Sequence, residues 1–152
     1  MMRALTIRHP WPWAICYLGK DVENRCWFPS REQLRVGDRF AIHAGKMPSV
    51  IEIREAFSGM DAMGCIDEHT KTPTLADLRT QESRIVAVAT YAGAVVHHLS
   101  SWFVGAYGWT WSKLVVLPEP VMCRGAQGLW AIPSDVEARV LAQMPVSDGG
   151  AA

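Results

Sequence analysis

The segment from Ile85 to Val96 constrains the fold more than any other stretch of the chain. It is an almost continuous series of small and β-branched residues with Gly93 inside it. Such a series predicts a central strand buried on both faces, and the interior glycine predicts a bulge or a sharp bend. A bent strand of this kind is typical of a small closed barrel. We therefore expect an α+β protein built around a β-barrel.

The remaining strand signals are shorter and are separated by turn residues or prolines. Together they predict a barrel of about five to six mostly antiparallel strands with flanking helices. Pro118 and Pro120 are expected to end one strand before the next begins. The further strands are expected at residues 4–7, 39–44, 109–117, 121–123 and 129–132.

Helix signals lie between these strands in the chain and after the last of them. Pro10 suits the first turn of an apolar helix that Gly19 ends. Ser49 followed by Glu52 predicts a capping box. Expected helices cover residues 10–18, 50–57 and 74–78, and a last one of roughly ten residues is capped by Ser134, while residues 58–73 are expected to be a mobile excursion.

Length and composition describe one ordinary globular domain. A chain of 152 residues, 49% hydrophobic and 20% charged, fits a single domain over residues 1–145, with a disordered tail at 146–152. We expect no membrane span and no signal peptide, because Arg8, Pro10 and Pro12 interrupt the apolar start. Four scattered cysteines fit reduced thiols, and hence a cytoplasmic location, better than a zinc site.

The net charge of zero hides an uneven distribution. Residues 1–46 carry eight basic and four acidic residues, whereas residues 47–84 carry four basic and seven acidic ones. A neutral chain lacks the charge for strong, sequence-independent binding along a polyanion. A local basic face that contacts a few phosphates remains compatible with this distribution.

Three charged residues follow the first expected helix within six positions: Lys20, Glu23 and Arg25. A short charged run directly after a buried helix can hold polar groups in fixed positions, and we interpret it as the floor of a binding cleft, with Val22 as its apolar anchor. The alternative interpretation is a solvated surface run in which Lys20 only compensates the helix dipole.

Other chemical motifs are weak. His97 and His98 are adjacent, so on a strand they point to opposite faces and do not suit one common metal ion. Cys26 with His43 could form a nucleophile and base, but a single pair of distant residues indicates little without geometry. Seven tryptophans are more informative. Trp11, Trp13 and Trp130 are expected in the core, whereas Trp27, Trp102, Trp109 and Trp111 lie near loops or strand starts, where a base could stack on them.

Four segments together resemble one protein family. Residues 4–13 (ALTIRHPWPW), 19–25 (GKDVENR), 42–46 (IHAGK) and 127–130 (QGLW) are similar to the ASCH domain, a member of the PUA-like superfamily of small β-barrels. The Lys-x-x-Glu-Asn-Arg motif followed by Ile-His-Ala is specific, and the similarity extends over roughly residues 3–132.

This resemblance implies a cleft used for single-stranded RNA or a modified nucleobase. No cofactor is expected. Lys20, Glu23 and Arg25 would line the cleft floor, and Trp109 would offer a face for stacking. Glu23 would accept hydrogen bonds from an exocyclic amine, while the two cations engage a phosphate or carbonyl. The full set of expected nucleic-acid-binding residues is Arg8, Trp11, Lys20, Glu23, Asn24, Arg25, His43, Lys46 and Trp109.

The same family also suggests enzymes. Some ASCH-like proteins remove an acyl group from N4-acylated cytidine with a lysine, a threonine three residues later and a distant glutamate. The residue three after Lys20 is Glu23, which lacks the hydroxyl nucleophile of that mechanism. A ribonuclease is the other hydrolase alternative, in which Lys20 stabilises charge and Glu23 or His43 acts as base.

Overall fold

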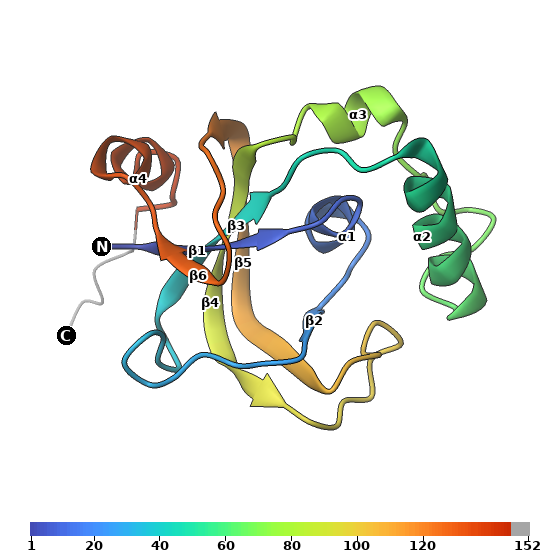
Figure 1. The fold of residues 1–152 in the computed structure, drawn as a ribbon, viewed down its shortest axis with the longest axis horizontal. Coiled ribbons are helices and arrows are strands. Elements are labelled where there is room, and N and C mark those ends of the chain that lie inside the picture. The colour runs from blue at the N-terminus through green and yellow to red at the C-terminus, as the bar shows by residue number, and fades with distance from the viewer. Residues whose placement is uncertain (147–152) are drawn as a thin grey trace.

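A curled sheet of six strands and four helices make up the protein, whose computed structural model describes residues 1–146 (Figure 1). The expected tail covers residues 146–152, and all of it except Val146 lies outside the described residues. In chain order the elements are β1 (Arg3–Ile7), α1 (Trp11–Tyr17), β2 (Val22–Arg25), β3 (Arg39–Ala44), α2 (Val50–Ala62), α3 (Leu75–Arg79), β4 (Arg84–Val95), β5 (Tyr107–Met122), β6 (Leu129–Ala131) and α4 (Ser134–Leu141).

The sheet has the strand order β2-β5-β4-β3-β1-β6 and rolls into a half-barrel. β1 and β3 are parallel, and the other neighbouring pairs are antiparallel. In Figure 1, α4 lies next to the end of the sheet where the chain begins, while α2 and α3 lie at the opposite end, beyond α1. The expected α+β class and the mostly antiparallel pairing are confirmed, whereas no strand was expected at residues 22–25, where β2 lies.

The bend expected in the central strand is present. Gly93 has a φ of 119°, which side chains rarely adopt, and the β4–β5 register shifts between Tyr91 and Gly93. The strand break expected at Pro118 is wrong, because β5 runs on to Met122. Leu117 to Pro120 lie in a bulge opposite β4, so neither proline has to donate to the ladder there.

Helix starts follow the local sequence where a capping box is present. The capping box expected at Ser49 with Glu52 forms, and a second reciprocal box forms at Thr74 with Asp77. α2 continues to Ala62, so the first part of the expected excursion is helical. The cap expected at Ser134 is wrong, because Pro133 occupies the N-cap and Ser134 is the first helical residue.

Trp109 is the largest fully buried side chain and lies in the main apolar cluster. Its ring packs edge-on against Phe40, Tyr91 and Trp27 at centroid distances of 5.9, 5.8 and 5.0 Å. The expectation that Trp11, Trp13 and Trp130 fill the core is confirmed only in part: all three are half-buried, and Trp11 and Trp130 pack against the apolar clusters. The tryptophans that are buried are therefore Trp109, from the strand paired with β2, and Trp102, in a second apolar cluster.

Candidate functional site

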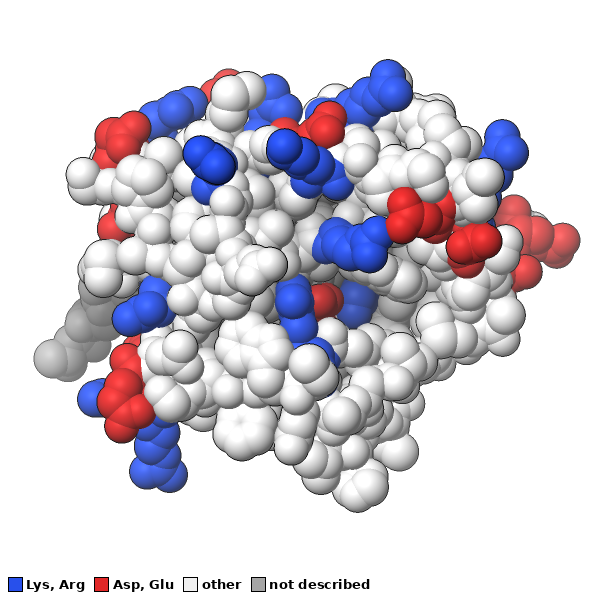
Figure 2. Space-filling view, in the orientation of Figure 1, with Lys and Arg blue, Asp and Glu red and all other residues white. Residues whose placement is uncertain are grey.

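A cavity of about 340 Å³ opens where the rolled sheet leaves β1 and β2 facing one another. Figure 2 shows this hollow near the centre of the face, with basic and acidic side chains together at its bottom. Its walls come from the end of β1, from α1, from β2 and from the loop before β5. The lining residues are Thr6, Ile7, Arg8, Trp11, Lys20, Glu23, Asn24, Arg25, Met63, Trp102 and Val104.

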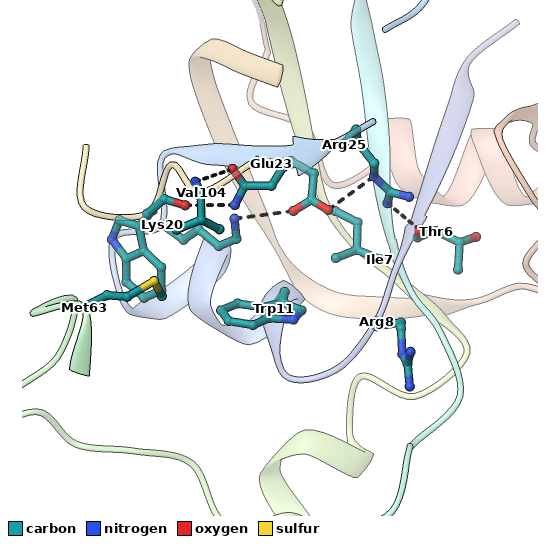
Figure 3. Close-up of a pocket in the computed structure, with 11 residues that line it drawn as sticks. Thr6, Ile7, Arg8, Trp11, Lys20, Glu23, Arg25, Met63 and Val104 are labelled. Carbon is teal, nitrogen blue, oxygen red and sulfur yellow. Dashed lines mark hydrogen bonds and ion pairs between the residues drawn. The ribbon is translucent and has the colours of Figure 1, made fainter. Parts of the chain in front are cut away.

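The floor of the cavity is an ionic row of Lys20, Glu23 and Arg25 (Figure 3). Lys20 Nζ lies 3.5 Å from Glu23 Oε2, and Arg25 Nε lies 3.3 Å from Glu23 Oε1. The carboxylate thus stands between two cations, and each of its oxygens faces one of them. The three charged groups expected to converge on one concave site do so.

Strand alternation explains which β2 side chains enter the cavity. Glu23 and Arg25 are two residues apart and point to the same face, whereas Val22 points the other way and is fully buried. Glu23 lies directly opposite Trp109 in the β2–β5 pairing. Glu23, which is 7% exposed, therefore lies above the apolar core at the bottom of the cavity.

Lys20 is positioned by the end of α1. Gly19, with a φ of 78°, turns the chain, and the Lys20 amide then donates to Ala14 O over 3.1 Å. The ammonium, in a residue only 3% exposed, donates to the backbone carbonyl of Val22. Desolvation lowers the pKa of Lys20 from its ordinary value, and the neighbouring Glu23 carboxylate partly offsets this. A buried lysine with a perturbed pKa in a cavity is typical of functional sites.

Trp11 and Arg8 form the outer parts of the cavity. The Trp11 ring centroid is 5.7 Å from Lys20 Nζ, within the range of a cation–π contact. Figure 3 shows the indole below the ionic row and Arg8 farther from that row than Trp11. Arg8 is largely exposed and pairs with Glu52 of α2 over 2.6 Å. The site therefore combines a charged floor, an aromatic wall and a cation at its rim.

Asn24 shapes one wall without offering its side chain to the cavity. Its Nδ2 donates to Trp102 O over 2.8 Å, and its Oδ1 accepts from the amides of Val104 and Gly105 at 3.0 and 3.2 Å. These three bonds use the side chain to hold the loop before β5 against β2. Asn24, which was expected among the nucleic-acid-binding residues, is thus positioned to hold the wall of the site.

Three of the expected binding residues do not line the cavity. Trp109 has 0% exposure, so it has no free face for stacking, because its register opposite Glu23 turns it into the barrel. His43 is 1% exposed and is covered by the segment before β6, where Gly125 approaches its ring. Lys46 is exposed beyond the end of β3.

His43 instead belongs to a buried hydrogen-bond chain. Its Nε2 lies 2.7 Å from Cys123 O and must donate, so Nδ1 accepts from the Thr6 hydroxyl at 3.2 Å. The Thr6 oxygen in turn accepts from Trp130 Nε1 over 3.0 Å. Desolvation lowers the pKa of His43, which keeps the neutral tautomer required by this chain. This geometry fits a structural role, not that of a general base in the cavity.

Several lining residues were not expected from the sequence. Met63 follows α2 and Val104 comes from the loop before β5, far from the charged motif in the chain. Trp102 was one of four tryptophans considered for stacking, and local sequence offered no reason to prefer it. Only the packing of α2 and this loop against α1 brings them to the cavity.

Within residues 1–146, no group of three or more His, Cys, Asp or Glu side chains is arranged to hold a metal ion. The helices of that region are also too short or too polar for any of them to cross a bilayer. Comparison of the sequence with protein-family models and with curated proteins finds no match.

Proposed function

We propose that this protein is an ASCH-type module whose cavity binds a single nucleobase of RNA or of a modified nucleoside. One observation carries the proposal: a buried carboxylate held between two cations at the bottom of a small cavity with an aromatic wall. Ligand sites are usually such concavities, with a few fixed polar groups that set orientation. The volume of about 340 Å³ is near the lower end for ligand sites and favours one small planar group.

The chemistry of the floor matches the edge of a base. An ionised carboxylate has about four acceptor positions, and the two cations occupy one side of each Glu23 oxygen. The remaining positions suit an exocyclic amine, which carboxylates accept in nucleobase recognition, while Lys20 and Arg25 suit a ring carbonyl. Trp11 supplies a face for stacking. Arg8 lies at the rim, where its guanidinium could bind a phosphate once its ion pair with Glu52 has broken.

Binding is tested directly with calorimetry on adenosine, cytidine, guanosine, uridine, N4-acetylcytidine and a hexauridylate RNA. We expect saturable binding of at least one of these and its loss in Glu23→Gln, in which the amide no longer offers a second acceptor. Glu55→Gln on the exposed face of α2 is the matched control and should bind as the native chain does. Equal binding by both variants, or no binding of any ligand, would contradict the proposal.

A hydrolase acting on RNA or an acylated nucleoside is the second candidate. The observation that favours it is the lowered pKa of Lys20 beside the Glu23 carboxylate, because such pairs are typical of proton transfer sites. Incubation with hexauridylate and with N4-acetylcytidine, followed by mass spectrometry, distinguishes the two functions. Shortened RNA or released acetate that disappears in Lys20→Met would support catalysis, and unchanged substrates would leave binding alone.

A further inference from the structure

A second, larger groove borders the proposed base site at the pair formed by Arg25 of β2 and Tyr107 of β5. It has a volume of about 770 Å³ and is formed by the connection between β2 and β3, the end of β4 and the start of β5. Phe28 and Tyr107 stand in it with ring centroids 5.0 Å apart, in an edge-to-face arrangement. Phe28 is 53% exposed and Val36 and Val96 are also largely exposed, so a continuous apolar surface faces solvent.

The two hollows share one pair of residues as their common wall. Arg25 lines the base site, and its cross-strand partner in β5 is Tyr107, which lines the groove. Opposite residues of an antiparallel pair have Cβ atoms roughly 5 Å apart. A polymer that fills the first site and continues across this strand pair therefore enters the groove.

The charged residues of the groove favour a negatively charged polymer. Among the described residues that line it, the charged side chains are Arg31 and Arg35, both exposed. The Arg35 Nε donates to Arg31 O over 3.3 Å, which brings the two arginine residues together at one edge. An aromatic platform beside two exposed arginines resembles the arrangement with which proteins bind single-stranded nucleic acid, where bases stack on aromatic rings and cations contact the phosphates.

We infer that this groove binds the nucleotides adjacent to the recognised base in single-stranded RNA, with a base stacked on Phe28 and Tyr107 and phosphates at Arg31 and Arg35. The inference rests on the proposed function of the neighbouring cavity and adds the polymer as its substrate class. A free nucleoside would occupy the first site alone. Affinity should therefore rise with RNA length, and the increase should depend on the groove.

The test compares uridylates, adenylates and cytidylates of one, three and six nucleotides, measured by fluorescence anisotropy and calorimetry. We expect Phe28→Ala to weaken hexamer binding by about 5- to 150-fold and to leave mononucleoside affinity unchanged. Leu99→Ala removes another exposed apolar side chain and is the control. Loss of two phosphate contacts in the double variant Arg31→Glu/Arg35→Glu should make the slope of log affinity against log salt shallower by about 1.4.

The control for the double variant is Arg54→Glu/Arg79→Glu, which changes the net charge equally on the exposed faces of α2 and α3. Equal effects of the two double variants, or no gain of affinity with length, would overturn the groove inference while leaving nucleoside binding intact. A proline-rich peptide that binds the groove when the hexamers do not would also overturn it. Unaltered binding of nucleosides and hexamers in Glu23→Gln would instead reject the proposed function.

Discussion

The Arg25 guanidinium donates a 2.8 Å hydrogen bond to the backbone carbonyl of Thr6, joining two strands that are separated by three others in the sheet order. β6 pairs with β1 from Arg3 to Leu5 and stops one residue short of Thr6. The carbonyl that the ladder leaves open there is thus satisfied by a side chain from β2. This contact brings the two sides of the half-barrel together at the cavity.

Removal of the Glu23 charge should destabilise the fold. Glu23→Gln leaves the buried Lys20 ammonium beside a neutral amide, and breaking a buried pair in this way costs about 3 kcal/mol. Urea unfolding measures the loss. Lys20→Met combined with Glu23→Leu should recover much of it, because the buried ammonium is gone and the remaining cation, Arg25, is partly exposed and bonded to Thr6 O, yet it should not restore ligand binding. A double variant less stable than both single variants would contradict this account.

Trp11 should report ligand binding by its fluorescence. We expect the quench on binding to disappear in Trp11→Phe and affinity to fall, since base stacking on an aromatic side chain contributes about 1–3 kcal/mol. Trp13 is on the same helix but packs on Tyr17, at 4.5 Å between centroids, away from the cavity lining. Trp13→Phe should therefore retain both the quench and the affinity. A quench that survives in Trp11→Phe and is lost in Trp13→Phe would reverse the assignment.

Asn24→Ala should release the loop that carries Trp102 and Val104. The variant leaves the amides of Val104 and Gly105 without their acceptor, so hydrogen exchange at both should accelerate. Asn24→Asp keeps an acceptor for the two amides and loses only the donor to Trp102 O. Protection of the two amides should therefore persist in the aspartate variant. Equal exchange in all three proteins would show that other contacts hold the loop.

Two glycines should respond to alanine with opposite signs. A Cβ on Gly125 would lie 2.6 Å from His43 Cε1 and 2.9 Å from Thr6 Oγ1, inside the buried hydrogen-bond chain. Gly125→Ala should cost roughly 1–3 kcal/mol through overpacking. Gly59 lies within α2 with open space around it, so Gly59→Ala should stabilise the protein by about 0.5–1 kcal/mol. Thermal unfolding of both variants gives the signs.

Buried neutral histidines should make the protein less stable in acid. Desolvation lowers the pKa of both His43 and His9 below the ordinary 6.5, so the unfolded chain takes up protons before the folded one does. The contribution of the two neutral histidines to the free energy of unfolding is therefore fully present above pH 6.5. It is lost as the pH falls toward the pKa values of the folded protein, by at most about 1.4 kcal/mol per pH unit for each histidine. Chemical unfolding between pH 7.5 and about 5 measures this slope.

The contribution of His43 is isolated by its glutamine variant. His43→Gln can still donate to Cys123 O but no longer titrates, so its slope of stability against pH should be shallower than that of the native chain. The exposed His97 provides the control, because His97→Gln should leave the slope unchanged. The comparison uses the slope of the free energy of unfolding against pH, because this slope does not depend on how much less stable the variant is at every pH. A slope unchanged in His43→Gln would assign the acid sensitivity to other groups.

Local sequence determined the parts of this protein that depend on neighbouring residues. Ser49 with Glu52 is sufficient for a helix start, because the capping bonds form within one turn. Gly93 marks the bend in β4 because only glycine adopts its backbone conformation without strain. The charged run after α1 was correctly interpreted as the floor of a cleft, but the strand β2 that places Glu23 and Arg25 on one face was not expected from the sequence.

Tertiary structure alone decided how these parts serve the site. Strand pairing places Trp109 opposite Glu23 and so buries a tryptophan that, in sequence, looked available for stacking. A bulge against β4 lets β5 pass through Pro118, which a local rule reads as a break. Trp102 and Met63 reach the cavity through contacts between elements distant in the chain. Register and packing between distant elements depend on the whole sheet, so no single segment of sequence specifies them.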